Sequence, residues 1–229
     1  MRGLFVTGTD TGVGKTVLAA AIVAALRARG ASVVVRKPVV TGLDEPAPAD
    51  WPADHELLAR AAGGDADDVA TVTYGPPVSP HLAAELAGRP ISAAALADAA
   101  RDAASRAEAI VVEGVGGLLV PLSPADDVRS LARTLELPLL IAARPGLGTI
   151  NHTLLTLEAA RAASLTVAAV VLTPWPKAPA MLERSNRETI ARLGEVEVET
   201  LPHVARAAPE LLAQAAAALP IDRWLAPGR

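Results

Sequence analysis

The sequence predicts an α/β fold in which helices cover both faces of a mostly parallel sheet. Short apolar runs typical of buried strands alternate with longer Ala-rich helical stretches along the chain, and the first strand leads directly into a glycine-rich turn. Right-handed crossovers between such strands make the sheet parallel. The chain has 229 residues, 51% of them hydrophobic, and we expect one domain spanning residues 1–229.

The opening segment predicts a phosphate-binding loop between the first strand and the first helix. Apolar residues 4–7 precede Gly-Thr-Asp-Thr-Gly-Val-Gly-Lys-Thr, residues 8–16, and an Ala-rich helical stretch then runs to Arg29. Glycines allow successive backbone N–H groups to point toward an anion, and the helix adds the positive end of its dipole. Thr9 stands where the strict motif has glycine, so the loop is a variant. The predicted fold is therefore P-loop NTPase-like, and an ordinary glycine-rich turn is the weaker alternative.

The end of this loop carries the two side chains that triphosphate chemistry requires. Lys15 would reach the terminal phosphates as a point charge, and the Thr16 hydroxyl would be a ligand of Mg²⁺. The loop residues that we expect to bind the nucleotide are Gly12, Val13, Gly14, Lys15, Thr16 and Val17.

A second buried strand, residues 31–35, leads to another lysine. In open parallel sheets the ligand crevice lies outside the carboxyl ends of the strands. Pro38 keeps Lys37 extended, so Lys37 and Thr41 are expected beside the phosphate loop. A surface lysine at a strand end is the alternative.

Two carboxylates are candidate Mg²⁺ ligands. Glu113 ends the apolar strand 109–113 just before a run of glycines, and a carboxylate in such a strand is costly to bury without a cation or several donors. Phosphoryl-transfer sites commonly place a Mg²⁺-binding acid there. Asp54 follows a proline-rich loop, residues 43–53, and starts a helix, where it would either complement the helix dipole or face Mg²⁺.

The rest of the chain continues the alternation of strands and helices. Ser79 followed by Pro80 is typical of a helix start with a serine cap. Residues 148–151, Gly-Thr-Ile-Asn, expose N–H groups at a later helix start and form a second possible anion site. The further predicted elements are strands at 70–74, 138–143, 166–172 and 198–201, and helices at 91–107, from 149 to about 164, at 180–193 and at 209–218.

Composition restricts the possible partners and compartments. The net charge of −4 and the absence of a Lys/Arg cluster argue against nucleic acid. No apolar run has the length of a membrane span and no leader pattern precedes the first strand, so we expect a cytoplasmic protein that does not bind membranes. The sequence contains no cysteine, which excludes disulfides, thiolate metal sites and a cysteine nucleophile.

Five segments together resemble the dethiobiotin synthetase family, and the likeness covers nearly the whole chain. Lys-Pro-Val-x-[Ser/Thr]-Gly and Gly-x-Ile-Asn-His are more selective for this family than the phosphate loop alone. The segments are residues 8–16, 37–42 (Lys-Pro-Val-Val-Thr-Gly), 79–81 (Ser-Pro-His), 112–117 (Val-Glu-Gly-Val-Gly-Gly) and 148–152 (Gly-Thr-Ile-Asn-His).

The resemblance implies a homodimeric, ATP- and Mg²⁺-dependent ligase of biotin biosynthesis. Its substrate would be 7,8-diaminopelargonate, carbamated by CO₂. The carbamate would attack the γ-phosphate to give a carbamic-phosphoric anhydride, and the second amine would displace phosphate to close the ureido ring. Such chemistry depends on electrostatic clamping and orientation more than on covalent help from the protein.

The same resemblance assigns roles to matching positions. Lys15 and Lys37 would be catalytic, and Thr16, Asp54 and Glu113 would hold Mg²⁺. The expected substrate-binding residues are Thr11, Lys37, Thr41, Ser79, Thr149, Ile150 and Asn151. Outside the loop, the expected nucleotide-binding residues are Asp54, Glu113, Gly114, Val115, Gly116, Thr173, Pro174, Pro202, His203 and Val204.

Two positions depart from the family pattern. Thr173-Pro174-Trp175 stands where family members often carry Asn-Asp, whose amide can bind adenine, so the base preference is open. A family aromatic near the substrate carboxylate is replaced around Asn186.

Two other classes share the phosphate loop. A cobyrinate-type amidoligase uses a fused glutaminase with a cysteine nucleophile, so only an unfused remnant would fit this chain. Partition-type switch ATPases carry a second lysine early in the loop, where this chain has Asp10.

Overall fold

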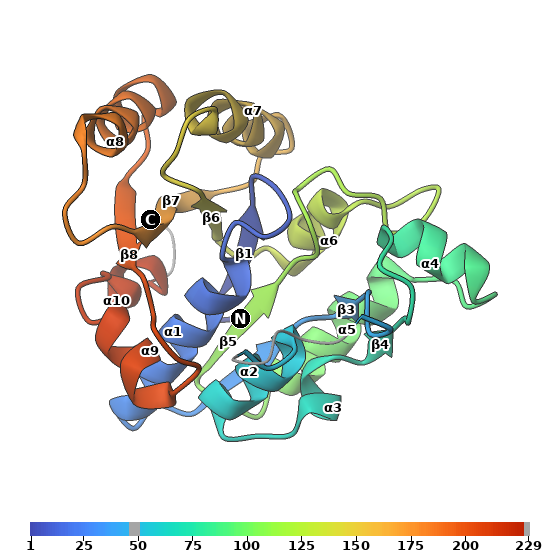
Figure 1. The fold of residues 1–229 in the computed structure, drawn as a ribbon. Helices are drawn as coiled ribbons and strands as arrows, with labels where there is room; N and C mark the ends of the chain where they lie inside the picture. Colours follow the sequence, from blue (N-terminus) through green and yellow to red (C-terminus); the bar gives the residue numbers. More distant parts are fainter. Residues whose placement is uncertain (46–50, 227–229) are drawn as a thin grey trace.

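The computed structural model describes residues 1–45 and 51–226. Its main element is a six-stranded sheet in the order β2-β5-β1-β6-β7-β8, with every neighbouring pair parallel (Figure 1). The predicted loop at 43–53 lies partly outside the described residues. The strands of this sheet are β1 (Gly3–Gly8), β2 (Val33–Arg36), β5 (Ala109–Glu113), β6 (Leu139–Ala143), β7 (Val167–Trp175) and β8 (Val198–Pro202).

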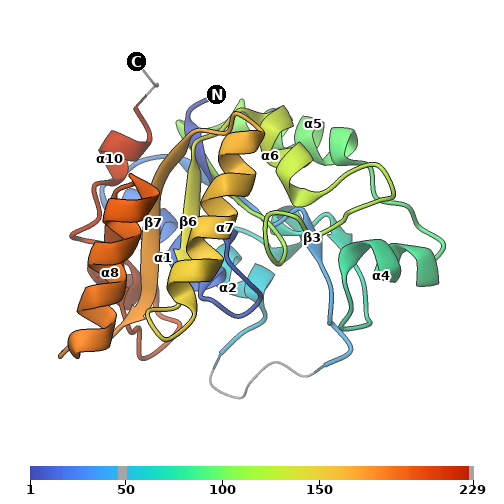
Figure 2. The same cartoon turned by 90° about the horizontal axis from the view of Figure 1, so that it is seen from above.

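Helices cover both faces of this sheet (Figure 2). One face packs against α1 (Lys15–Ala28), α2 (Asp54–Ala62), α9 (Pro209–Ala215) and α10 (Ile221–Trp224). The other face packs against α5 (Ala93–Ala104), α6 (Val128–Leu135), α7 (Thr149–Ala162) and α8 (Met181–Gly194). The predicted α/β architecture is therefore confirmed.

Four smaller elements complete the described part of the chain. They are α3 (Ala66–Val69), α4 (Pro80–Leu86) and a second, two-stranded parallel sheet of β3 (Val39–Val40) and β4 (Val72–Thr73). This sheet carries the chain from Lys37 toward Thr41, and the sequence did not predict it as a separate sheet.

Alternation along β1 shows how the core is divided. Successive side chains of a strand point to opposite faces, so Leu4 and Val6 join the cluster under α1 whereas Phe5 joins the cluster under α5 and α6. All three are fully buried. Because β1 lies between β5 and β6, the loop that follows it emerges at the centre of the sheet.

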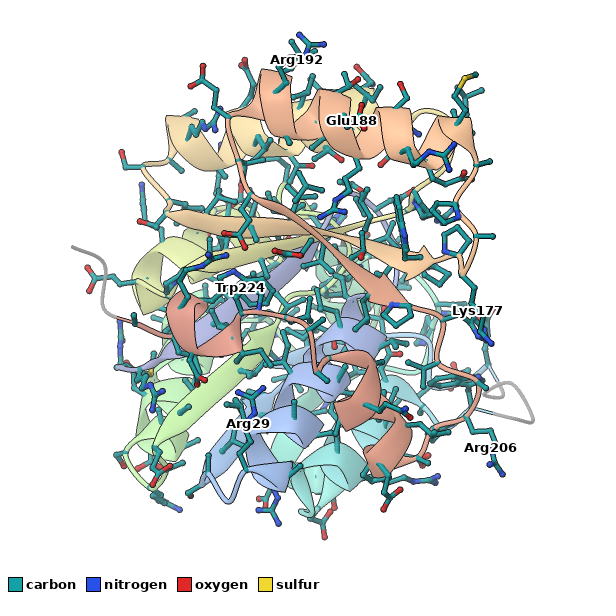
Figure 3. The ribbon with its side chains drawn as sticks, turned by 90° about the vertical axis from the view of Figure 1, so that its left-hand side faces the viewer. Arg29, Lys177, Glu188, Arg192, Arg206 and Trp224 are labelled. Carbon is teal, nitrogen blue, oxygen red and sulfur yellow. The ribbon has the colours of Figure 1, made fainter. Side chains whose placement is uncertain are left out.

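The carboxyl-terminal segment closes the face that contains α1. Trp224 is 3% exposed in the core, and Asp222 accepts a 3.1 Å hydrogen bond from Arg29 beyond the end of α1. On the opposite side of the molecule, Glu188 and Arg192 project from the exposed surface of α8 (Figure 3). Over residues 1–45 and 51–226, none of the helices combines the length and apolar character that crossing a bilayer requires.

Several boundaries differ from the sequence prediction. Strand β7 continues to Trp175, so Thr173 and Pro174 are strand residues and not the loop after it. Pro174 has no N–H to donate, and the register with β8 shifts between Leu172 and Trp175 to accommodate it. The short helices α3 and α10 and the two-turn helix α6 were not predicted.

We predict that Phe5→Ala lowers the free energy of unfolding by about 3–5 kcal/mol, because it leaves a ring-sized cavity in a closed core. Urea unfolding followed by circular dichroism measures the loss. Met181→Ala is the matched control, since Met181 is 79% exposed and surface truncation changes stability by about 0.5 kcal/mol or less. Equal losses in the two variants would contradict the packing described for β1.

Candidate active site

The phosphate loop joins β1 to α1 in a backbone conformation that favours glycine at two positions. Gly12 has φ 68° and Gly14 has φ 91°, a left-handed region that side chains rarely adopt. A Cβ on Gly14 would also lie 2.8 Å from Cγ2 of Thr173. The conformation of the loop therefore depends on the two glycines and on the close approach of Thr173, a residue of β7, to Gly14.

Lys15 begins α1 and lies folded back over the loop. Its Nζ donates a 2.8 Å hydrogen bond to the backbone carbonyl of Asp10. Burial lowers the pKa of Lys15, with the Glu113 carboxylate acting in the opposite direction. In this position the ammonium group can neutralise an anion that the loop's N–H groups bind.

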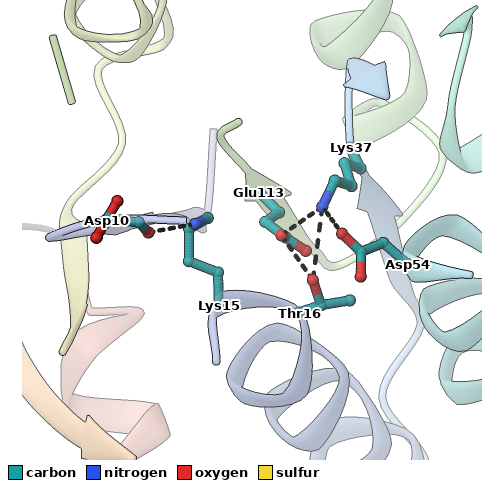
Figure 4. Close-up of polar contacts among 6 residues, drawn as sticks. All are labelled: Asp10, Lys15, Thr16, Lys37, Asp54 and Glu113. Atoms are coloured by element: carbon teal, nitrogen blue, oxygen red, sulfur yellow. Dashed lines mark hydrogen bonds and ion pairs between the residues drawn. The ribbon is translucent and has the colours of Figure 1, made fainter. Parts of the chain in front are cut away.

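A second polar cluster joins residues from four segments at the carboxyl edge of the sheet (Figure 4). Lys37 follows β2, Glu113 ends β5 and Asp54 begins α2. The Lys37 ammonium lies 2.8 Å from Oε1 of Glu113 and also donates to Asp54. The Thr16 hydroxyl donates to the same Oε1 at 2.9 Å. The structure thus brings together the second lysine and all three predicted Mg²⁺ ligands.

The charges in this cluster depend on one another. Burial alone would lower the pKa of Lys37, but the Glu113 and Asp54 carboxylates more than offset this and raise it. Burial would raise the pKa of Asp54, whereas the Lys37 ammonium lowers it. Burial raises the pKa of Glu113, which is 0% exposed, against the opposing effect of Lys37. Lys37 is therefore held as a cation facing an acidic pair.

The donor set at this cluster fits Mg²⁺. Oε2 of Glu113 is buried and has no hydrogen-bond partner among the described residues, which leaves a hard oxygen free for a cation. Two carboxylates and one hydroxyl are available, and Mg²⁺ is usually held by one or two carboxylates together with substrate phosphates. Over residues 1–45 and 51–226 there is no group of three or more His, Cys, Asp or Glu side chains that could hold a metal ion.

Thirteen of the predicted site residues line one cleft of about 660 Å³. The cleft extends from the phosphate loop past Lys37 to the region of β3 and α4. Its predicted members are Thr11, Gly12, Gly14, Lys15, Thr16, Val17, Lys37, Thr41, Asp54, Ser79, Glu113, Val115 and Gly116.

Other predicted residues do not line this cleft. Val13, Gly114, Val204 and Thr173 are buried in the fold, whereas Pro174, Pro202 and His203 lie near the end of β7 and β8. The methyl group of Thr173 faces Gly14 of the phosphate loop.

The residue Ser79 differs in detail from its prediction. It precedes α4 as expected, but its hydroxyl makes no capping hydrogen bond to the helix. Instead its Oγ lies 3.0 Å from Nδ1 of His81, in an exposed contact.

The second predicted anion site lies at the start of α7, beyond the cleft. Gly148 has φ 89° and turns the chain into the helix. Thr149 is buried with its hydroxyl unpartnered in the described part of the chain, Ile150 is half-buried and Asn151 is exposed. A ligand at this helix end would therefore meet backbone N–H groups and Asn151 before the Thr149 hydroxyl.

The sequence did not single out every residue around the loop. Glu45, Val40, Pro77 and Val120 line the cleft, and Arg144 donates a 3.2 Å hydrogen bond to the backbone carbonyl of Thr11. The signal for Arg144 was present, because it directly follows β6 at the edge where ligands bind.

The fold and this site define a P-loop NTPase. Among solved structures, a ParA family ATPase from Chlorobium tepidum TLS has a similar fold, with a TM-score of 0.54 at 14% identity over 98% of this chain and 96% of that one. A family model described as an AAA domain matches residues 2–206.

Similar proteins of known name show to which family of P-loop NTPases the chain belongs. An ATP-dependent dethiobiotin synthetase of Anaeromyxobacter dehalogenans (strain 2CP-C) is 44% identical over 217 residues, covering 92% of this chain and 96% of the relative. One from Mycobacterium sp. (strain KMS) is 40% identical over 230 residues, covering 99% of each. The chain belongs to the family of ATP-dependent dethiobiotin synthetases, ligases of biotin biosynthesis.

We predict that the Lys37 and Glu113 charges stabilise the fold only as a pair. Lys37→Met should lower the free energy of unfolding by about 3–5 kcal/mol, because it leaves a buried carboxylate without its cation. Adding Glu113→Gln should recover most of that loss, since the amide carries no charge. Urea unfolding in EDTA measures both variants, and a double variant no more stable than Lys37→Met would contradict the pairing.

Proposed function

We propose that this protein closes the ureido ring of dethiobiotin from 7,8-diaminopelargonate and CO₂, with ATP and Mg²⁺. The observation that carries the proposal is the convergence of Lys15, Lys37, Asp54, Glu113 and Thr16 on one cleft beside the phosphate loop, in a chain of this family. The proposal treats residues 1–229 as one catalytic domain.

The proposed reaction has two group transfers. One amine of diaminopelargonate adds to CO₂ and gives a carbamate. A carbamate oxygen then attacks the γ-phosphorus as its bond to ADP breaks, which forms a carbamic-phosphoric anhydride. The second amine attacks the carbamate carbon, phosphate leaves, and loss of the amine proton completes the ring.

The two lysines have separate tasks in this proposal. Lys15 neutralises charge on the terminal phosphates from the loop side, and Lys37 faces both the carbamate and the transferring phosphoryl group. The Glu113 and Asp54 carboxylates raise the pKa of Lys37 despite its burial. Preorganised cations in a site with little water stabilise developing charge more strongly than they would in bulk solvent.

Thr16, Asp54 and Glu113 would hold Mg²⁺ in this proposal. The ion supplies neutralisation of phosphate charge during transfer. Hydrogen bonds from the Thr16 hydroxyl and from Lys37 hold the Glu113 carboxylate in position. Thr41 and Thr11 line the cleft beside these residues.

We also propose a homodimer in which the start of α7 binds the substrate carboxylate across the interface. Exposed leucines support it: Leu119 and Leu155 line one hollow beside α7 and are 56% and 60% exposed, and Leu147, two residues before α7, is 93% exposed. Large apolar side chains gathered on one face are typical of an association surface. A second copy covering them would bring the exposed Asn151 to a neighbouring cleft.

A switch ATPase of the partition type is the alternative. The solved ParA family structure supports only a common fold at its 14% identity. Asp10 occupies the loop position of the lysine that characterises that class, and its backbone carbonyl accepts from Lys15.

One assay tests the proposed function. The protein is mixed with diaminopelargonate, bicarbonate, Mg²⁺ and ATP, and dethiobiotin is sought by mass spectrometry. We expect product from the unmodified chain, and losses of the order of 10²-fold or more for Lys15→Ala and for Lys37→Ala, each of which removes a preorganised charge. Folding is checked by circular dichroism. No product from the unmodified chain would refute the proposal, and near-normal turnover of a folded Lys37→Ala would refute that residue's role.

We further predict relaxed base selectivity, with ATP not strongly preferred over CTP or GTP. The triphosphate would be held by loop N–H groups and Lys15 whatever the base. The Thr173 side chain packs against Gly14, and Pro174 offers no backbone donor. Backbone groups of Pro202, His203 and Val204 are the remaining candidates for base contacts.

Competition among nucleotides at fixed Mg²⁺ measures this selectivity. A site built to hydrogen-bond one partner typically rejects others by several orders of magnitude. An ATP preference above roughly a hundredfold would therefore show that a base-binding group exists elsewhere in the chain.

A further inference from the structure

The loop between β6 and α7 is fastened to two different parts of the molecule. It runs through residues 144–148 and presents the start of α7, which is the proposed carboxylate subsite. Helices α7 and α8 lie side by side on the same face of the sheet (Figure 1, Figure 2). The loop therefore passes between α8 on one side and the phosphate loop on the other.

Asn186 makes the attachment to α8. It is 5% exposed, although it lies on a helix whose neighbouring positions Ser185 and Arg187 are exposed. Its Nδ2 donates to the carbonyl oxygens of Pro145 at 2.8 Å and Gly146 at 3.0 Å. Carbonyl oxygens only accept, so the amide must turn its nitrogen toward them. Both donor hydrogens of one side chain are thus used on adjacent residues of the same loop.

Arg144 makes the attachment to the phosphate loop. Its Nη2 donates to the carbonyl of Thr11 at 3.2 Å and lies 3.6 Å from the position that a Cβ on Gly12 would take. The loop before α7 is therefore tied through Asn186 to a buried point of α8 and through Arg144 to the Thr11–Gly12 half of the phosphate loop.

We propose that Asn186 is a positioning residue for the substrate, which holds the start of α7 in place without touching a ligand. The inference rests on the proposed function, because it assigns the substrate carboxylate to that helix start. Without the two hydrogen bonds, the Pro145–Gly146 segment can shift, and the N–H groups that follow it lose their fixed direction. Arg144 extends the same constraint to the phosphate loop.

Asn186→Ala tests the proposal. We expect the KM for diaminopelargonate to rise about tenfold, the size expected from two lost hydrogen bonds, with kcat and the KM for nucleotide changed less than twofold. Asn186→Asp keeps the shape but replaces the two donors with acceptors facing carbonyl oxygens, so its effect should be larger. Ser185→Ala, one residue away on the exposed side of α8, is the control and should match the unmodified protein.

Amide hydrogen exchange separates this inference from the proposed function. In Asn186→Ala, amides of residues 146–151 should exchange faster than in Ser185→Ala, whether or not the protein makes dethiobiotin. If Asn186→Ala does not fold, Asn186→Asp carries the same test, because it keeps the volume and loses both donors. Arg144→Ala, at an exposed position, checks the second attachment of the same loop. Faster exchange at the same amides is expected there too.

Three results would overturn the proposal. These are unchanged exchange at residues 146–151, an unchanged KM for diaminopelargonate despite faster exchange, or a loss confined to kcat. Absence of product from the unmodified protein, with the exchange change present, would instead refute the proposed function while leaving the loop attachment in place.

Discussion

A lysine held between two carboxylates at the edge of a buried parallel sheet determines how the site is built. Lys37 and Glu113 come from adjacent strands, β2 and β5, and neither side chain has more than a few per cent of its surface in solvent. Two such charges are tolerated in the interior only while each keeps its partner. The register of β2 against β5 is therefore constrained by charge as well as by apolar packing.

The sequence alone predicted the central strands correctly, because each of them is a short apolar run with a clear end. Strand β5 was predicted with the bounds that the structure has, since Ala109 to Glu113 is an apolar run closed by a charge and a glycine. The carboxyl-end rule then predicted Lys37 and Thr41 beside the phosphate loop without any knowledge of their distances. What the sequence could not supply was the pairing of Lys37 with Asp54, because a loop of no regular pattern separates them.

Other parts were missed for identifiable reasons. Helix α6 buries Val128, Leu131, Ala132 and Leu135, a helical spacing that was present in the sequence but was not used. The continuation of β7 through Pro174 contradicts the usual effect of proline, and the pairing with β8 changes register at this point. The role of Asn186 depends on two helices and a loop meeting in space, and a single sequence contains no sign of that contact.

Helix α1 determines which parts of the site are free to adapt. Every residue from Leu18 to Leu26 is buried, between the sheet on one side and α2 and α9 on the other. The phosphate loop is thus continuous with a helix whose central residues are fully enclosed, so much of the entropy of ordering the loop is lost when the chain folds and not when a nucleotide binds. The opposite wall of the cleft is built differently, because Thr41, Glu45 and Ser79 lie on loops, so the two walls of one site differ in how firmly the fold holds them.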